Sequence, residues 1–255
     1  MLLIRLVRSH LTTHRLGREI TYHPSTGSTN DDLWSLLDAG KVEAGHMVVT
    51  DGQRAGKGRQ GRRWFSAPGL GLAFSVLLRP ELSPERLGLL SLGIGVAAVA
   101  ALAFDGVKAR LKWLNDIVWE GRKLGGILSE SRMTNDGPVV VIGIGINVNE
   151  QIADFPEELH PIAVSVRMVR QAPVQREVLL ARILNRYEEL LMDGLKDAVS
   201  LWQDRCAHLG RAVRFHGPDG PLEGRFTGVS AAGQGLIEVG TEIHALATRD
   251  LDMIP

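Results

Sequence analysis

The sequence predicts an α+β fold in which a large domain with a mixed, largely antiparallel sheet is followed by a small all-β domain. Short apolar strands joined by turns crowd between residues 109 and 146, and this spacing favours antiparallel pairing. Two long helical segments, 87–104 and 175–192, can cover one side of that sheet. After Gly210 the chain breaks into short β-type pieces separated by Gly, Pro and Asp turns. We therefore expect a main domain at 1–208 and a C-terminal domain at 209–255.

The overall composition is that of an ordinary globular protein. Hydrophobic residues make up 44% of the 255 residues and charged residues 23%, so the chain can bury a core. Because the formal net charge is +0, binding of anions needs a local cluster of cations. The single cysteine, Cys206, excludes an internal disulfide and a cysteine-rich zinc site, and we expect a buried, inert thiol. These features predict a protein of the reducing cytoplasm.

The N-terminal part of the chain predicts one short helix. Residues 1–7 are mostly apolar, but cations follow without a small-residue cleavage site, so we expect no secretion signal. Residues 21–28 are rich in turn formers. Ser28 or Thr29 can then cap a helix that ends at Gly40.

A basic loop and an apolar helix follow. Strands at 47–50 and 72–78 flank residues 51–71, which are rich in glycine and cations and lack any period. Residues 87–104 carry no charge over 18 residues, which touches the lower limit for a membrane span. Their glycines and alanines, without aromatic anchors, favour a buried helix packed on a sheet. We therefore expect no membrane association.

The rest of the chain predicts strands, two helices and then strands again. In the main domain we expect strands at 109–113, 116–120, 124–130 and 138–146 and helices at 175–192 and 196–208. In the C-terminal domain we expect strands at 212–215, 222–229, 236–239 and 242–247. The histidines are dispersed and show no metal-ligand spacing.

The segment from Gly56 to Trp64 is the strongest candidate for a binding site. It combines three glycines, four cations and an aromatic residue. Glycines let backbone amides turn toward a bound phosphate, and Lys and Arg neutralise the phosphate. A solvated basic loop or a nucleic-acid contact with an aromatic platform has the same composition. The residues alone leave these interpretations open.

The glycine spacing of this segment also satisfies G-x-G-x-x-G, the fingerprint of a dinucleotide-binding fold. That fingerprint needs a helix to begin within the motif. Residues 64–68 lead instead to a turn and then to a strand. We therefore reject dinucleotide binding.

Five motifs of this chain resemble those of biotin protein ligases, and they occur in the same order. They are Ser28-Thr29-Asn30, the loop Gly56 to Trp64, Lys112-Trp113-Leu114-Asn115-Asp116, Lys123-Leu124-Gly125-Gly126-Ile127-Leu128-Ser129-Glu130, and Gly143-Ile144-Gly145-Ile146-Asn147-Val148-Asn149. The resemblance covers residues 11–150 and, more loosely, the rest. Two positions depart from the family, which usually has Arg where Lys57 stands and Pro where Leu114 stands.

The resemblance implies a class II synthetase-like core followed by an SH3-like β-barrel. It implies an AMP-forming enzyme that makes biotinyl-5'-AMP from biotin and ATP and then transfers biotin to a lysine of the biotin carboxyl carrier protein of acetyl-CoA carboxylase. Several members carry a DNA-binding winged helix in front. Because the resemblance starts near Leu11, we expect no repressor activity and no binding of DNA. Mg²⁺ is expected mainly on the phosphates of ATP, without certain protein ligands, and a homodimer is compatible with the sequence.

By position, the resemblance also assigns the residues of the site. Biotin is expected at Ser28, Thr29, Asn30, Gln53, Gly56, Lys57, Gly58, Arg59, Lys123, Gly126 and Leu128. ATP is expected at Arg59, Arg62, Trp64, Asn115, Asp116, Lys123 and Asn147. A carboxylate that attacks the α-phosphorus of ATP is repelled until cations intervene. Lys123 and Arg59 are therefore the expected catalytic residues, with Lys123 stabilising the pentavalent transition state.

Two other functions stay open at this point. A lipoate or octanoate ligase or transferase shares the core, but its pocket accepts a long acyl chain instead of a ureido ring. A nucleic-acid-binding module would use the same basic loop, although the zero net charge weighs against it.

Overall fold

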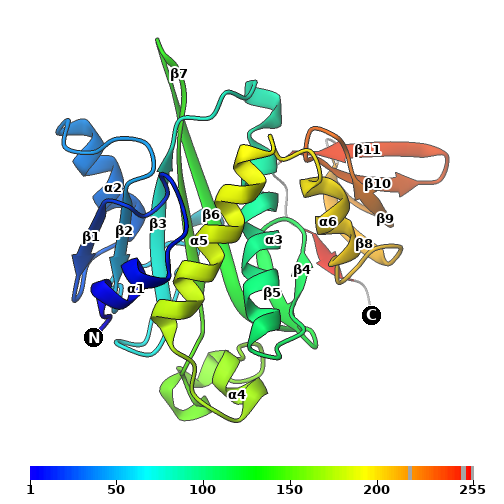
Figure 1. The fold of residues 1–255 in the computed structure, drawn as a ribbon. Coiled ribbons are helices and arrows are strands. Elements are labelled where there is room, and N and C mark those ends of the chain that lie inside the picture. Colours follow the sequence, from blue (N-terminus) through cyan, green and yellow to red (C-terminus); the bar gives the residue numbers. More distant parts are fainter. Residues whose placement is uncertain (218–219, 248–250, 254–255) are drawn as a thin grey trace.

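The computed structural model describes residues 1–217, 220–247 and 251–253, and the fold contains two sheets (Figure 1). The larger sheet has seven strands in the order β1-β2-β3-β7-β6-β5-β4. β1 and β2 pair in parallel, and all other neighbours are antiparallel, so the predicted mixed, largely antiparallel sheet is confirmed. The strands are β1 (Ile20–His23), β2 (Met47–Thr50), β3 (Leu72–Leu78), β4 (Arg110–Lys112), β5 (Asp116–Trp119), β6 (Arg122–Thr134) and β7 (Gly137–Ile146).

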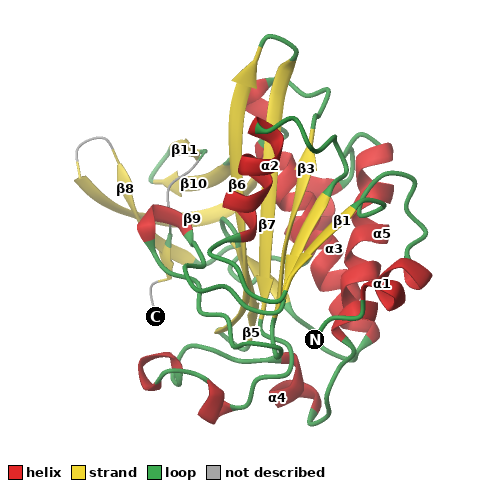
Figure 2. Cartoon of the chain, turned by 90° about the vertical axis from the view of Figure 1, so that its left-hand side faces the viewer, coloured by secondary structure: helices red, strands yellow, loops and turns green. Residues whose placement is uncertain are grey.

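Helices cover both faces of this sheet, although we expected them on one side. α3 (Gly88–Phe104) packs against β4, β5 and β6, and α5 (Arg176–Met192) packs on α3. α2 (Thr29–Asp38) lies against the other face, over β2, β3 and β7 (Figure 2). The alternation along β2 explains this arrangement, because Met47 and Val49 join the main core whereas Val48 packs with Leu33 and Trp34 of α2. The part of this face that α2 does not cover is available for a site.

The apolar helix is a core helix, as the sequence predicted. The span Pro84–Phe104 is long and apolar enough to cross a membrane, by length and composition alone, but 67% of its apolar window is buried inside the molecule. Gly95 allows a close approach to the sheet, since a Cβ there would lie 3.2 Å from Leu111 Cδ2 and 3.3 Å from Ile127 Cδ1. Tyr187 of α5 donates its hydroxyl to Leu90 O at 3.1 Å, so α3 and α5 form one layer.

The N-terminal residues are attached to α5. α1 (Ile4–His10) packs on α5, and the backbone N–H of Leu3 donates to Glu177 Oε1 at 2.9 Å. Further on, the N–H groups of Arg15 and Leu16 donate to Glu188 Oε1, each at 2.8 Å. Carboxylates on α5 thus hold the chain before β1.

The smaller sheet is antiparallel and consistent with an SH3-like domain. Its strand order is β11-β10-β9-β8-β12. The bounds are β8 (Ala212–Gly217), β9 (Gly220–Val229), β10 (Gly235–Val239), β11 (Glu242–Leu246) and β12 (Asp252–Met253). The predicted domain at 209–255 also includes 218–219, 248–250 and 254–255, which lie outside the described residues. The division at residues 208 and 209 stays a prediction.

Aromatic side chains join the two sheets. The ring centroids of Trp113 and Trp202 are 6.0 Å apart, and those of His208 and Phe226 are 4.4 Å apart. Trp202 lies on α6 (Ala198–Asp204) and Phe226 on β9. A Cβ on Gly235 of β10 would lie 2.8 Å from Trp113 Cε2, so this contact needs a glycine. The C-terminal sheet therefore packs directly against the ring of Trp113.

Several predicted elements have other bounds. The turn-rich segment 21–28 contributes to β1, because residues 20–23 pair in parallel with β2. β6 extends to Thr134, and α6 is shorter than the predicted helix at 196–208. The sequence indicated neither α1 nor α4 (Val166–Arg170).

Candidate functional site

A cleft of about 600 Å³ lies beside α2, on the part of this sheet face that α2 does not cover. Its floor is made by β6 and β7, where Gly126 is paired with Gly145 and Leu128 with Gly143. Glycine is required at these floor positions of β7, because a Cβ on Gly143 would collide with the Asn30 side chain. Every residue that we expected to bind biotin or ATP lines this cleft except Gly56.

One end of the cleft is lined by neutral polar side chains that belong to a hydrogen-bonded network. The N–H of Thr29 donates to Gln53 Oε1 at 2.8 Å. Ser75 Oγ lies 2.7 Å from Thr29 Oγ1 and 2.6 Å from Asn30 Oδ1. Asn30 Nδ2 in turn donates to Glu130 Oε2 at 2.7 Å. Because these bonds fix the rotamers of Thr29, Asn30 and Gln53, this end is prepared for an uncharged polar ligand group.

The predicted helix cap is only partly right. Ser28 occupies the N-cap position of α2, but its side chain makes no capping hydrogen bond, and Thr29 is already the first helical residue. Ser28 is instead a cleft residue with 3% of its surface exposed.

The glycine-rich segment folds back on itself as a narrow loop. The N–H of Gly58 donates to Arg62 O at 2.7 Å, and that of Trp64 donates to Gly56 O at 2.8 Å. Only a 3₁₀ turn, Arg59–Gly61, forms inside it, so no α-helix begins there and the rejection of dinucleotide binding is supported. Gly56 allows the base of the loop to close, because a Cβ there would lie 2.6 Å from Trp64 O.

The other end of the cleft is strongly cationic. Among the described residues that line the cleft, Asp116 is the one carboxylate, and it pairs with Lys123 at 2.7 Å. Lys123 Nζ also lies 6.0 Å from the centroid of the Trp64 ring. The cations of the lining are Lys57, Arg59, Arg62, Arg63, Lys112 and Lys123. Such a surplus of positive charge suits a ligand that carries several negative charges.

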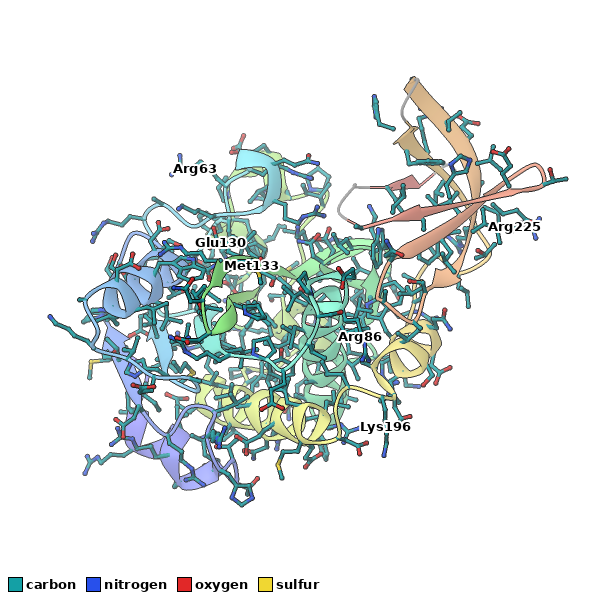
Figure 3. The ribbon with its side chains drawn as sticks, turned by 90° about the horizontal axis from the view of Figure 1, so that it is seen from above. Arg63, Arg86, Glu130, Met133, Lys196 and Arg225 are labelled. Atoms are coloured by element: carbon teal, nitrogen blue, oxygen red, sulfur yellow. The ribbon has the colours of Figure 1, made fainter. Side chains whose placement is uncertain are left out.

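Arg59 and Lys57 occupy different electrostatic environments. Burial, and secondly the charge of Arg62, lower the pKa of Arg59, although Asp116 opposes this effect. Lys57 pairs with Asp31 Oδ1 at 2.5 Å, and this hydrogen bond raises the pKa of its ammonium. Figure 3 shows Arg63 of the loop on the same half of the molecule as Glu130, with Arg225 of β9 at the far end.

The two predicted asparagines hold backbone segments around Lys123. Asn115 Nδ2 donates to Ile127 O at 2.8 Å, and Asn147 Nδ2 donates to Val164 O at 3.1 Å and to Lys123 O at 3.3 Å. Both side chains border the cleft. Both asparagines therefore hold in place β6, the strand that carries Lys123.

The sequence did not point to several residues of the site. Ser75 is a polar residue inside an otherwise apolar strand, and such a residue in the sequence indicates a buried hydrogen bond or a ligand contact. Glu130 ends the motif that begins at Lys123, but its hydrogen bond to Asn30 joins positions 100 residues apart. The further lining residues that we did not assign include Lys112, Phe155, Leu159, Ile162, Ala163 and Leu251.

A resident metal is not indicated within 1–217, 220–247 and 251–253, where no group of three or more His, Cys, Asp or Glu could hold one. Cys206 is buried, as expected, and burial raises the pKa of its thiol to about 11. The single carboxylate of the cleft is nevertheless compatible with Mg²⁺ bound chiefly by phosphates.

The fold and this two-ended cleft are those of an acyl-ligase class of enzymes. A sequence model of the biotin/lipoate A/B protein ligase family matches residues 22–147. A bifunctional ligase/repressor of Bacillus subtilis is 32% identical over 97% of this chain and 78% of its own length. A biotin-[acetyl-CoA-carboxylase] ligase of Mycobacterium tuberculosis is 31% identical over 80% of this chain and 76% of its own.

A solved structure agrees with these relatives. The biotin protein ligase of Aquifex aeolicus, in complex with biotin and ATP, superposes with a TM-score of 0.79 at 27% identity, covering 93% of this chain and 100% of the other. The chain therefore belongs to the biotin protein ligase family.

Proposed function

We propose that this protein is an ATP-dependent biotin protein ligase that biotinylates a lysine of a biotin carboxyl carrier protein. The observation that carries the proposal is one cleft with a neutral polar end, at Thr29, Asn30 and Gln53, and a cationic end around Lys123. The neutral end suits the uncharged ureido ring of biotin, and the cationic end suits the phosphates of ATP.

In the first step, an oxygen of the biotin carboxylate attacks the α-phosphorus of ATP, and the bond to the pyrophosphate oxygen breaks. The products are biotinyl-5'-AMP and pyrophosphate. Lys123 and Arg59 reduce the repulsion between the two anions and stabilise the charge of the pentavalent transition state. Bound Mg²⁺ would supply further positive charge to the phosphates, with Asp116 as the nearby carboxylate. Trp64 offers an aromatic face to the adenine.

In the second step, the deprotonated amine of the acceptor lysine attacks the carbonyl carbon of the intermediate. An amide forms, the bond to the AMP oxygen breaks, and the amine loses a proton. The loop from Gly56 to Trp64 shields the mixed anhydride from water until the acceptor arrives.

The decisive experiment is exchange of pyrophosphate into ATP by the purified full chain. We expect exchange that depends on biotin, and transfer of biotin to a carrier domain. Exchange that depends on lipoate or octanoate, and not on biotin, would overturn the proposal in favour of the related acyl ligases. Lys123→Gln should lower the exchange rate by about 10²-fold or more. Arg59→Gly should slow exchange as well, since it removes a cation from the transition state, and it should release biotinyl-5'-AMP faster than the wild type.

We also propose that this ligase acts in the cytoplasm and does not act as a repressor. Balanced charge, 29 basic against 29 acidic residues, agrees with the second point, because no field over the whole molecule attracts DNA. A filter-binding series over salt concentration tests it, and specific retention of duplex DNA would contradict it. Sedimentation at several protein concentrations tests whether the enzyme is a homodimer.

A further inference from the structure

An ion pair at the rim of the cleft connects the glycine-rich loop to α2. Lys57 Nζ lies 2.5 Å from Asp31 Oδ1. Asp31 is in the first turn of α2, next to Asn30, which borders the neutral end of the cleft. The pair is about half exposed, with 47% of the Lys57 side chain and 49% of the Asp31 side chain accessible. It therefore lies at the rim of the cleft.

The rest of the loop shows why this rim contact matters. At the base, the N–H of Ala55 donates to Gly27 O at 3.0 Å, and the ring of Trp64 rests on Gly145. Lys57 stands opposite Arg63 in the folded-back loop, one step from the base toward its tip. The ion pair with Asp31 therefore fixes the loop beyond its base, over the space between α2 and the sheet.

The residue type at position 57 is matched to this contact. The planar fork of an Arg binds a carboxylate with two parallel hydrogen bonds, whereas Lys is a compact point charge with a flexible stem. One carboxylate oxygen of Asp31 receives this charge. Glu130 adds negative charge on the same side, since it also acts on Lys57 electrostatically.

We infer that Asp31 is a positioning residue that, through Lys57, holds the glycine-rich loop closed over the bound biotinyl-5'-AMP. This inference rests on the proposed function. Asp31 is not among the described residues that line the cleft, so it should affect how long the intermediate is retained more than how fast it forms. Because exposed ion pairs contribute modestly, we expect its loss to speed release by about threefold to fivefold.

The test compares Asp31→Asn with Asp32→Asn in the full chain. Both substitutions remove one carboxylate from the first turn of α2, so both lose the same favourable interaction with the helix N-terminus. Asp32 has His23 Nε2 of β1, and not Lys57, as its ionic neighbour, at 3.9 Å. Enzyme loaded with biotin and α-labelled ATP is diluted, and the release of labelled biotinyl-5'-AMP is followed at low and at high salt.

We expect Asp31→Asn to release the intermediate about threefold to fivefold faster than the wild type at low salt, and equally fast at high salt, where the pair is screened. Asp31→Glu should restore retention. At low salt, equal release by the wild type and Asp31→Asn, or equal acceleration in Asp32→Asn, would overturn the inference. Pyrophosphate exchange is measured in parallel. If the wild type shows no biotin-dependent exchange, the proposed function fails; if exchange is present but release is unchanged, only the role of Asp31 fails.

Discussion

The indole of Trp64 lies directly on the backbone of Gly145. A Cβ built on Gly145 would lie 2.5 Å from Trp64 Cε2 and 2.6 Å from its Nε1. Trp64 ends the cationic loop, and Gly145 lies in the floor of the cleft near the end of β7, so this contact fixes the distance between the loop and the floor.

The substitution Gly145→Ala should displace the ring of Trp64. The added methyl group cannot share its space with the indole, and the strand at this point cannot move without breaking its pairing. We expect the KM for ATP to rise by about tenfold or more, equivalent to about 1.4 kcal/mol of binding. Steady-state exchange kinetics and tryptophan fluorescence measure the effect. Gly27→Ala is the control, because a Cβ there meets nothing within 4 Å; similar kinetics for both variants would contradict the prediction.

Ser75→Ala should weaken the neutral end of the cleft. Its hydroxyl lies within hydrogen-bond distance of both Thr29 Oγ1 and Asn30 Oδ1, and it is fully buried. Removing it leaves these atoms short of a partner, at a cost of about 1–3 kcal/mol. We expect the KM for biotin to rise by about tenfold, with a smaller change for ATP. Ser200→Ala, on the exposed side of α6, is the control. An unchanged KM for biotin would show that Ser75 does not support the ligand.

Arg176→Met should destabilise the whole domain. Arg176 donates to Asp51 Oδ1 and to Gly71 O, both at 2.8 Å, and the side chains of Arg176 and Asp51 are 7% and 10% exposed. Without this arginine, the Asp51 carboxylate keeps the hydroxyl of Tyr22 and the N–H of Leu2 but loses its buried cation, and the free energy of unfolding should fall by about 3 kcal/mol. Urea denaturation at neutral pH measures this value. Arg186→Met breaks a more exposed pair with Glu189 and should cost at most about 1 kcal/mol; equal losses in the two variants would refute the prediction.

Glu150 should make stability depend on pH. Burial raises the pKa of this carboxyl to about 7 from an ordinary value of 4.5, so the folded state holds its proton more tightly than the unfolded state. The stability that the group contributes is complete below pH 4.5 and is lost as the pH rises through 7.

Glu150→Gln mimics the protonated form and should remove this loss. Relative to the wild type, the variant should gain stability at pH 8 by an amount on the order of 3 kcal/mol, and gain little at pH 4.5. Urea denaturation at both pH values measures the difference. Glu189→Gln, at an exposed position, should show no such trend. A variant whose gain in stability over the wild type is the same at pH 8 as at pH 4.5 would contradict the assignment.

Much of the fold was readable because its signals are local. The apolar run at 72–78 forms β3 with the predicted bounds, and the uncharged helix at 87–104 is buried as expected. The motifs meet in one cleft because two of them lie on the central strands β6 and β7, one lies in the turn between β4 and β5, and the start of α2 and the glycine-rich loop border the same face. Local pattern and motif order therefore sufficed for the outline of the site.

The parts that could not be predicted depend on distant partners. Residues 21–23 belong to a segment that looks turn-rich, and only the parallel pairing of residues 20–23 with β2 makes them a strand. Ser75 is conspicuous in its strand, yet nothing in the sequence shows that it faces Thr29, which lies 46 positions earlier. The pairing of Asp31 with Lys57 likewise needs the folded loop.

The attachment of the N-terminus to α5 also constrains how the protein is made. The bond between Leu3 and Glu177 spans 174 positions, so the first residues leave the ribosome long before their binding surface exists. Leu2 can bind Asp51 earlier, through its backbone N–H, but Leu3 and α1 find their partners only after α5 has emerged, so closure of the main domain is a late event of synthesis. A nascent chain that stalls ahead of α5 exposes the apolar side of α3 to chaperones and proteases.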